Sequence, residues 1–346
     1  MSDLSAGAQS TTPSEAGSRP RYLMVADYFW PAKVFGGPAY SNLNLCRGLA
    51  ALGREVRVVT SDANRGEPLG VPVGRWVGSF PGIRVVYHRV NNFGTRFHLI
   101  SARMLLDLWR EIGRADVVLV QGLYNLATPF AMLFGWLHGK TVVVTPHGGL
   151  SKELIALRRP RAKGLWLRCL AGPLANKVLW HATAEQEKAE ILQQFPKARV
   201  LVIPNGVDLD EYAEASADTG GEMRRRFGLA ENTGPVVVCL GRIHRKKGLD
   251  VLICAFETLL TEFPDAHLLI AGQDDGGELA RLRSLVSERR LAERVSFPGH
   301  LEGESKRLFL AGADLFVLPS LNENFGNVYA EALAAGTPVV ASKASA

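Results

Sequence analysis

The chain has 346 residues, 47% of them hydrophobic and 21% charged, with a formal net charge of +6 at pH 7. This composition is ordinary for a soluble globular protein and argues against a disordered or fibrous chain. The length indicates two domains, each large enough for a core of its own. The four cysteines form no Cys-x-x-Cys pair, so we expect reduced, mostly buried thiols and a cytoplasmic location.

Residues 1–20 contain no apolar stretch and are expected to form a disordered tail, not a signal peptide. The apolar run at 21–27 predicts a first strand, and a helix is expected from 39 to 52, ended by Gly53. Further apolar runs predict strands at 55–61, 115–121, 140–146, 177–183 and 199–205. After a polar, Gly-rich stretch, strands are expected again at 235–241, 266–272, 294–299, 313–319 and 337–342.

One uncharged segment, Val117–Leu137, is long enough to span a bilayer. Polar residues such as Gln121 and Asn125 interrupt it, and buried strands and helices have a similar hydropathy. We therefore expect a buried strand, a loop, and then a buried helix that reaches His138.

Apolar strands that alternate with helices predict an α/β fold with parallel sheets covered on both faces. We expect two Rossmann-like domains, at 21–205 and 223–346, joined by a linker at 206–222. Ligands of open α/β sheets bind beyond the carboxyl ends of the strands. The residues that follow each strand are therefore the candidates for a functional site.

The first strand is followed by a glycine pair, Gly36 and Gly37, and not by a P-loop or a GxGxxG motif. Glycine lets the backbone approach a ligand closely, and the N–H groups at the following helix start favour an anion. A plain glycine-rich turn would explain the same pair.

In the second domain, basic residues cluster after the strand at 235–241. Arg242 follows that strand directly and Lys247 precedes a helix. Arginine offers a planar fork to phosphate oxygens and lysine a point charge. A solvated basic loop would explain the composition, but a bound diphosphate also explains why the charges gather at a strand end.

Near the C-terminus, Glu323 lies in a loop after a strand and Glu331 lies on the second turn of the helix that follows. The backbone N–H groups of Phe325, Gly326 and Asn327, at the helix start, can hold phosphate. Carboxylates accept hydrogen bonds from sugar hydroxyls, so this stretch suits a nucleotide sugar. The alternative is one glutamate that favours the helix dipole and one exposed helix glutamate.

Taken together and in this order, the motifs are similar to those of retaining glycosyltransferases of family GT4. They comprise the glycine pair, TPHG at Thr145–Gly148, IPNGVD at Ile203–Asp208, GR…KG at Gly241–Gly248, and the two glutamates. The resemblance covers about residues 21–341. It implies a GT-B fold, in which two Rossmann-like domains face a central cleft, and a hexosyltransferase that uses a nucleotide diphosphate sugar and no cofactor.

The resemblance also implies roles for individual residues. In this family, the residues that correspond to Arg242 and Lys247 bind the diphosphate of the donor. The residue that corresponds to Glu331 binds the ribose. The position of Glu323 faces the transferred sugar, and that of His147 lies in the cleft near the sugar and the acceptor. Glu323 and His147 are thus the expected catalytic residues.

Two further expectations concern the base and the stereochemistry. The base of the nucleotide is expected near the loop that contains Pro298 and Gly299. Family members retain the anomeric configuration, which is commonly explained by front-face attack with the leaving phosphate as base.

No Asp-x-Asp motif stands at a strand end, since Asp208 and Asp210 lie in the linker. Arg242, Lys247 and a helix dipole can offset the charge of the leaving diphosphate. We therefore expect transfer that needs no divalent metal.

The chain departs from the family pattern at its end. It stops at Ala346, where family members continue with another strand and further helices. We expect a C-terminally truncated second domain whose sheet lacks an edge and part of its cover.

The acceptor side is indicated by residues 151–177, which hold seven Lys or Arg residues and one acidic residue. Leucines and Trp166 are interleaved with these charges, as in elements that lie on a membrane surface. A solvated basic helix that packs its leucine face on the domain is the alternative. We expect a saccharide or polyprenol-linked acceptor at the cytoplasmic leaflet and no nucleic acid, because no nucleic-acid module accompanies the charge.

The sequence therefore predicts a glycosyltransferase of surface-polysaccharide or lipid-linked glycan assembly. Two alternatives remain open: a GT-B epimerase of nucleotide sugars, and an inactive, truncated domain that still binds a nucleotide or a partner.

Overall fold

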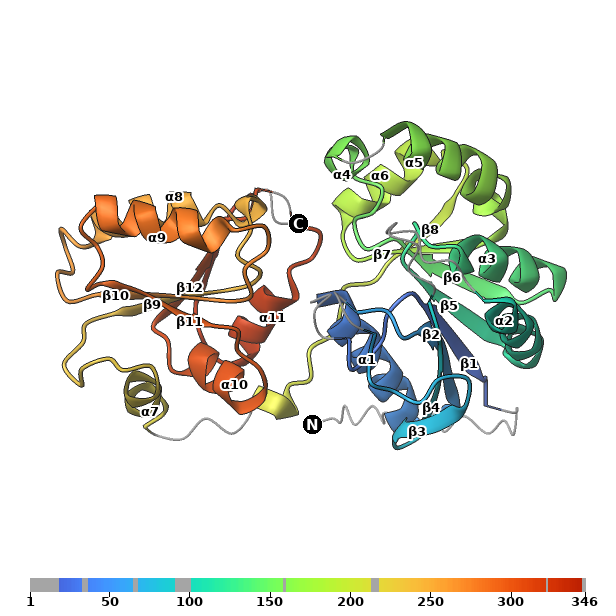
Figure 1. Cartoon of the computed structure of the whole chain (residues 1–346), viewed down its shortest axis with the longest axis horizontal. Coiled ribbons are helices and arrows are strands. Elements are labelled where there is room, and N and C mark those ends of the chain that lie inside the picture. Colours follow the sequence, from blue (N-terminus) through green and yellow to red (C-terminus); the bar gives the residue numbers. More distant parts are fainter. Residues whose placement is uncertain are drawn as a thin grey trace, which may run out of the picture.

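The computed structural model consists of two α/β units, each built on its own sheet (Figure 1). It describes residues 19–32, 37–64, 68–90, 101–157, 160–212, 218–321 and 323–343. Most of the predicted tail at 1–20, and Gly36 of the glycine pair, lie outside these residues. The chain leaves the first sheet at Val202 and enters the second at Val236.

The first sheet has the strand order β3-β4-β2-β1-β5-β6-β7-β8 within the described residues. All neighbours pair in parallel except β3 and β4. Its strands are β1 (Tyr22–Ala26), β2 (Val56–Ser61), β3 (Trp76–Phe80), β4 (Ile83–His88), β5 (Val117–Gln121), β6 (Thr141–Thr145), β7 (Leu179–Ala182) and β8 (Arg199–Val202). Its helices are α1 (Gly37–Ala51), α2 (Ala102–Arg114), α3 (Ala127–Leu137), α4 (Lys152–Leu157), α5 (Pro160–Trp166) and α6 (Glu185–Gln194).

Two apolar cores cover the two faces of this sheet, and β1 contributes to both. Leu23 and Val25 pack in the core that contains α2 and α3, whereas Met24 and Ala26 pack in the core that contains α1. Side chains of a strand alternate between its faces. A strand buried on both faces therefore reads as a continuous apolar run, which is what made β1 visible in the sequence.

The second sheet is parallel throughout, with the order β11-β10-β9-β12-β13. Its strands are β9 (Val236–Leu240), β10 (His267–Ala271), β11 (Val295–Gly299), β12 (Leu315–Leu318) and β13 (Val339–Ala341). Its helices are α7 (Thr219–Arg226), α8 (Leu249–Leu259), α9 (Glu278–Glu288), α10 (Gly303–Ala311) and α11 (Asn327–Ala334). Helices α8 and α9 cover one face, and α10 and α11 lie on the other (Figure 1).

The predicted α/β class with parallel sheets is confirmed, and each predicted strand is present. The segment Val117–Leu137 forms β5, a loop and α3, as expected. Among the described residues, no helix is long and apolar enough to cross a membrane. The β3–β4 hairpin was not predicted, although Pro81-Gly82, with a φ of 73° at the glycine, is a turn signal between two short strands.

The described parts of 151–177, which omit 158 and 159, form α4, α5, a π-helical turn (Leu167–Ala171) and a 3-10 segment (Gly172–Lys177). Leu165 is exposed, whereas Leu167 is buried. Trp166 is not a free surface side chain, because its indole N–H donates to the carbonyl oxygen of Leu123 at 3.0 Å. The segment is therefore anchored to the first domain through part of its apolar residues.

Candidate active site

The loop between β12 and α11 brings Glu323 next to Lys247. This β12–α11 loop spans residues 319–326, of which Asn322 is not described. The ammonium group of Lys247 and the carboxylate of Glu323 form an ion pair. Lys247 follows β9, the neighbour of β12 in the sheet, so the carboxyl ends of two adjacent strands meet at this point.

Helix α11 begins at Asn327, within the predicted helix start at 325–327. Gly326 adopts a left-handed φ of 70°, and a side-chain carbon added there would lie 2.4 Å from the ring of Tyr329. Only glycine fits this position without a shift of the ring. The first N–H groups of α11 have no acceptor within the helix itself.

Glu331 lies on the second turn of α11 and pairs with a lysine that the sequence analysis missed. Lys306 of α10 places its Nζ atom 2.7 Å from a carboxylate oxygen of Glu331. The same Nζ lies 5.9 Å from the centre of the Tyr40 ring, which belongs to α1 of the first domain. Burial raises the pKa of Tyr40, and the carboxylates of Glu302 and Glu331 raise it further. Both domains therefore form the surroundings of Glu331.

Arg242 also faces the first domain. Its guanidinium is about half exposed and lies 3.0 Å from a carboxylate oxygen of Asp275. Burial raises the pKa of Tyr28, at the end of β1, to about 12, and the nearby charge of Arg242 acts in the opposite direction. Arg242 thus lies close enough to Tyr28 to act on it electrostatically across the two units.

His147 occupies the turn after β6, as its TPHG context predicted. It adopts a left-handed φ of 50°, which is uncommon for a residue other than glycine. Its Nε2 atom lies 2.8 Å from the amide oxygen of Gln121. Burial lowers its pKa to about 4, although the Glu187 carboxylate favours the charged ring. The imidazole is therefore neutral at pH 7, and its Nε2–H donates to Gln121.

A cavity of about 180 Å³ opens beside His147 at the carboxyl edge of the first sheet. It is formed by the ends of β1 and β5, the start of α1 and the loop after β5. Its lining residues are Asp27, Tyr28, Pro38, Asn42, Gln121, Gly122, Leu123, Tyr124, Asn125 and His147. Hydroxyl, amide, carboxyl and imidazole groups lie among apolar groups in this lining, which suits a sugar with several hydroxyl groups and apolar ring faces.

Two asparagines of the second domain reach across to the first. Asn324 donates to the hydroxyl oxygen of Thr183 at 2.8 Å. Asn327 donates to the hydroxyl of Ser41 at 2.6 Å and accepts from Asn205 at 2.9 Å. A side-chain carbon added to Gly37 would lie 3.7 Å from the amide nitrogen of Asn327. The start of α1 therefore faces the start of α11, and the two expected anion sites lie together.

Pro298 and Gly299, expected near the base, end β11 at the same edge of the second sheet. Gly299 adopts a φ of 85°, and its carbonyl oxygen accepts the N–H of Gly272 at 2.7 Å. The guanidinium of Arg283 lies 6.0 Å from the ring centre of Phe297. These contacts fix the shape of the β11 end next to β10.

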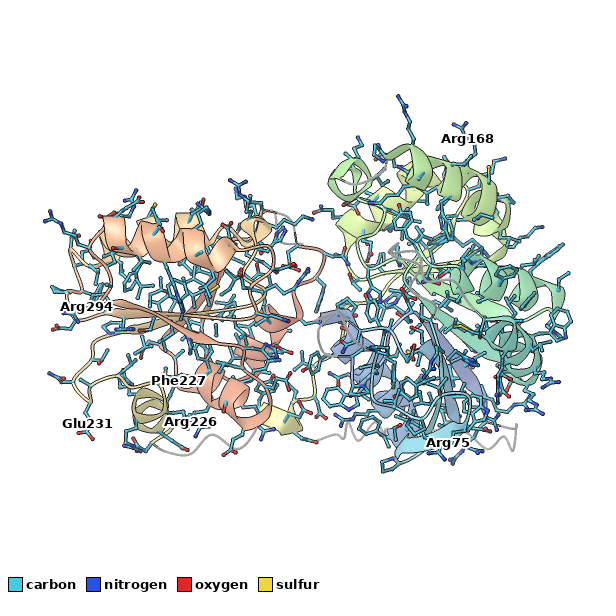
Figure 2. All side chains as sticks on the ribbon, in the orientation of Figure 1. Arg75, Arg168, Arg226, Phe227, Glu231 and Arg294 are labelled. Carbon is cyan, nitrogen blue, oxygen red and sulfur yellow. The ribbon has the colours of Figure 1, made fainter. Side chains whose placement is uncertain are left out.

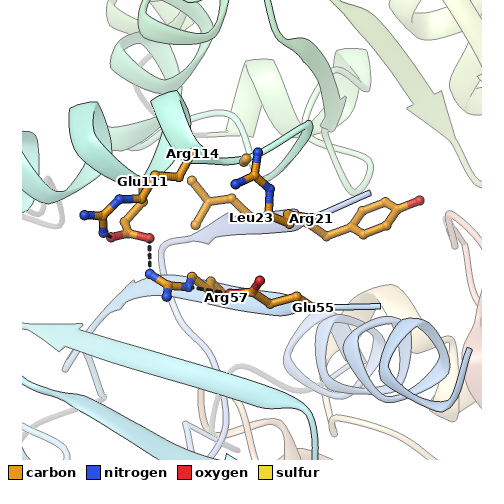
Figure 3. A pocket seen from close by; sticks show the side chains of 8 residues that line it. Arg21, Leu23, Glu55, Arg57, Glu111 and Arg114 are labelled. Atoms are coloured by element: carbon orange, nitrogen blue, oxygen red, sulfur yellow. Dashed lines mark hydrogen bonds and ion pairs between the residues drawn. The ribbon is translucent and has the colours of Figure 1, made fainter. Parts of the chain in front are cut away.

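A second cavity, of about 170 Å³, lies at the opposite edge of the first sheet, where β1 and β2 begin (Figure 3). Its charges are matched within the protein: Arg57 faces Glu111 at 2.6 Å, and Arg114 lies 2.9 Å from the other oxygen of Glu111. It contains none of the predicted site residues. Ligands of open α/β sheets bind at the other end of the strands, so this cavity is not the candidate active site.

Asp208 and Asp210, the Asp-x-Asp pair of the linker, serve a local turn. A carboxylate oxygen of Asp208 accepts the N–H of Asp210 at 3.2 Å, where the 3-10 turn Asp210–Tyr212 begins. Within the described ranges, no cluster of three or more His, Cys, Asp or Glu side chains could hold a metal ion.

The site contains further residues that sequence reasoning did not identify. They are Ser41, Thr183, Glu187, Lys306 and Asn324. Thr183 and Glu187 could have been noticed, because they follow β7 at the same edge as the TPHG turn. Lys306 gives no such signal, since it lies in the second turn of an ordinary amphipathic helix.

Two family models match the chain, and together they cover both domains. The model described as Glycosyltransferase Family 4 matches residues 35–211, about half of the chain. The model described as Glycosyl transferases group 1 matches residues 222–346.

Individual relatives agree with these matches. The chain is 31% identical over 328 residues to the D-inositol 3-phosphate glycosyltransferase of Xylanimonas cellulosilytica, covering 88% of this chain and 75% of that protein. It is 30% identical over 320 residues to the GDP-mannose:cellobiosyl-diphosphopolyprenol alpha-mannosyltransferase of Xanthomonas oryzae pv. oryzae, covering 91% and 77%. A GDP-mannose-dependent alpha-(1-6)-phosphatidylinositol monomannoside mannosyltransferase of Mycolicibacterium smegmatis is 38% identical, but the match spans only 43% of this chain and 39% of that protein.

Solved structures share the fold. Anabaena Alr3699/HepE in complex with UDP and glucose has a TM-score of 0.69 at 22% identity, covering 94% of this chain and 82% of that chain. WaaG, a glycosyltransferase involved in lipopolysaccharide biosynthesis, has a TM-score of 0.67 at 18% identity, covering 93% and 81%. The motifs, the facing carboxyl edges and these matches agree: the chain belongs to family 4 of the glycosyltransferases and has their GT-B fold.

Proposed function

We propose that this protein transfers a hexose from a nucleotide diphosphate sugar to a saccharide or lipid-linked saccharide, with retention of the anomeric configuration. The main support for the proposal is that candidate site residues of the two domains lie next to each other. The Lys247–Glu323 pair and the start of α11 lie on the second domain, and Asn324 links them to the first domain beside His147.

The donor binds to the second domain in this proposal. Its diphosphate lies against Arg242, Lys247 and the N–H groups of Phe325, Gly326 and Asn327, and Gly37, the described residue of the glycine pair, approaches it from the first domain. These groups offer positive charge and backbone donors to the same anion. Relatives named for GDP-mannose and a structural neighbour crystallised with UDP and glucose support a nucleotide sugar as the donor class.

The two glutamates contact two other parts of the donor, its ribose and its transferred sugar. Glu331 accepts hydrogen bonds from the ribose, and Glu323 faces the transferred sugar. The base lies near Pro298 and Gly299. Both carboxylates are largely buried, with exposed fractions of 19% for Glu323 and 17% for Glu331, so a sugar hydroxyl bound there competes little with water.

The acceptor occupies the cavity beside His147. The neutral imidazole and the amides of Gln121 and Asn125 offer hydrogen bonds to its hydroxyl groups. Attack then occurs on the face of the donor sugar from which the phosphate leaves. The leaving phosphate takes the proton of the acceptor hydroxyl, which makes the anomeric configuration of the product that of the donor.

The proposed transfer uses no divalent metal. The charge of the leaving diphosphate is offset by Arg242, by Lys247 and by the N-terminus of α11. The turn made by Asp208 and Asp210 supports a structural role for that pair.

We further propose that residues 151–177 rest on the cytoplasmic face of a membrane and give access to a polyprenol-linked acceptor. Leu165 is 64% exposed and Leu170 is 39% exposed. Arg161 and Lys163 belong to α5, as does Leu165. Arg168, in the π-helical turn that follows α5, points away from the domain (Figure 2). Exposed leucines beside arginines and lysines favour an anionic lipid surface.

The proposal is tested by incubating the purified chain with a panel of nucleotide sugars, with and without a polyprenol-linked saccharide. Acceptor-dependent release of nucleoside diphosphate, with a lengthened saccharide, is the expected result. An isomerised nucleotide sugar without acceptor would indicate an epimerase. Nucleotide binding without either product would indicate an inactive domain.

A further inference from the structure

Glu187, on the first turn of α6, is a fully buried carboxylate that receives three hydrogen bonds. One carboxylate oxygen accepts the N–H of Gly148 at 2.6 Å. The other accepts the N–H of Thr183 at 2.8 Å and the Thr183 hydroxyl at 3.0 Å. A buried charge is tolerated when donors surround it, and the N-terminal end of a helix favours a negative group.

The bond to Gly148 reaches the turn that carries His147. These two residues have consecutive left-handed φ values of 50° and 71°. Such a conformation persists only where the surroundings hold it, because it is strained for histidine. Glu187 holds the turn on the side of α6, while Gln121 holds the imidazole at 2.8 Å. The position of the His147 ring in the cavity therefore depends on Glu187.

The Thr183 hydroxyl extends this arrangement to the other domain. A hydroxyl has one hydrogen, and a carboxylate can only accept, so the Thr183 hydrogen points to Glu187. The oxygen lone pairs are then left to accept from Asn324, whose amide nitrogen is 2.8 Å away. Asn324 adjoins Glu323, and a side-chain carbon added to Gly148 would lie 3.4 Å from the Cβ atom of Asn324.

We propose that Glu187 is a positioning residue that couples the β12–α11 loop to His147 through the hydroxyl of Thr183. The Asn324–Thr183 bond joins the two domains and exists only when they are together. A donor sugar that orders Glu323 and Asn324 thereby fixes Thr183, Glu187 and the His147 turn in the arrangement that receives the acceptor. This inference rests on the proposed function, since it assigns His147 to the acceptor side.

A merely structural role for Glu187 is the competing explanation. In that case its loss lowers stability, and the remaining folded enzyme works normally. Glu111 provides a matched control, because it is a second buried carboxylate of the same domain that lies at the opposite sheet edge. Glu111→Gln should lower stability without changing the kcat of the folded fraction.

The central comparison uses Thr183→Val, which removes the hydroxyl at nearly constant shape, and Thr183→Ser, which keeps it. We expect Thr183→Val, Asn324→Ala and Glu187→Gln each to lower kcat at least tenfold, while the calorimetric Kd for nucleoside diphosphate stays within twofold. Thr183→Ser should keep kcat within twofold of the wild type. The double variant of Thr183→Val and Asn324→Ala should lower kcat no more than either single change does, because both changes break the same hydrogen bond.

Equal kcat values for Thr183→Val and Thr183→Ser would overturn the coupling, as would an Asn324→Ala variant with unchanged kcat. A second measurement keeps the inference separate from the proposed function. If the wild type transfers no sugar, amide hydrogen exchange of the segment 145–151 in the ligand-free protein still reports on these bonds. They are the hydrogen bonds that connect Asn324 to Thr183, Thr183 to Glu187, and Glu187 to Gly148. Exchange there should be faster in Glu187→Gln, Thr183→Val and Asn324→Ala than in Thr183→Ser and the wild type. Identical exchange in all variants would refute the coupling.

Discussion

Lys306 lies 2.7 Å from Glu331, and Lys247 forms a corresponding ion pair with Glu323. Glu323 and Glu331 are thus each held by a lysine from a separate element. All four side chains are less than one quarter exposed, so water and salt screen the attraction within each pair less than at an open surface. A carboxylate has room for several donors, so a lysine on one lone pair leaves others for sugar hydroxyls.

Lys306→Met tests whether this lysine orients Glu331. The change keeps most of the length of the side chain and removes its charge, so Glu331 should lose its fixed rotamer. We expect the binding of nucleoside diphosphate to weaken by about 1 kcal/mol, the upper end of the values measured for exposed ion pairs. Calorimetric titration measures it. Lys188→Met is the matched control, because Lys188 pairs with the largely exposed Glu185 at 2.9 Å in the first domain, outside the proposed donor site. Equal affinities of the two variants would contradict the role of Lys306.

Arg242→Ala and Lys247→Ala test the diphosphate site. Each removes one charge-assisted hydrogen bond to phosphate, which is worth roughly 1.5–3 kcal/mol. Titration with nucleoside diphosphate should therefore show clearly weaker binding in both variants. Arg289→Ala serves as the control, because that arginine pairs with Glu257 on the α8–α9 face. The diphosphate assignment fails if neither variant differs from Arg289→Ala.

The two glutamates should differ in kinetic effect. Glu331→Gln removes a ribose contact that exists equally in the ground and transition states, so it should mainly raise the KM for the donor. Glu323→Gln should mainly lower kcat, because the transferred sugar gains positive charge as its bond to phosphate breaks. Nucleoside diphosphate alone contains the ribose but not the transferred sugar. Only Glu331→Gln should therefore weaken its binding to the protein. Equal weakening by both variants would show that they share one structural role.

Activity should survive an excess of chelator. The positive groups around the diphosphate already offset its charge, so EDTA should leave the initial rate of nucleotide release unchanged. Dialysed enzyme, assayed with and without added Mg²⁺ or Mn²⁺, provides the control. Complete loss of activity in EDTA, restored by either ion, would show that a metal carries this charge.

Acidic pH should destabilise the protein through His147. Burial lowers its folded pKa to about 4 from an ordinary value of 6.5. Between these values the unfolded chain binds more protons than the folded chain, so stability falls as the pH falls from 6.5 toward 4. Urea unfolding at pH 7, 6 and 5 measures the decline, and His147→Gln should remove this part of it. A variant that loses stability as steeply as the wild type would show that His147 titrates normally.

The parallel strands could be predicted because their apolar runs are local features of the chain. Their buried faces require continuous hydrophobic residues, and glycine or proline marks most of their ends. The motif residues Arg242, His147 and Glu331 were equally visible, since each stands at a fixed distance after a strand. The β3–β4 hairpin was overlooked because Gly78 and Ser79 interrupt the apolar residues of β3, and Arg84 interrupts those of β4.

Sequence alone therefore determined the alternation of strands and helices, the two-domain organisation it predicts, and the chemical types of the candidate site residues. Only the tertiary structure decided which of them meet. Lys306 and Glu331 are 25 positions apart, and Asn324 and Thr183 are 141 apart. Contacts of this kind depend on how two sheets face each other and on which turn of a helix points into the cleft. No local pattern of residues encodes those relationships, because they arise from the packing of whole elements.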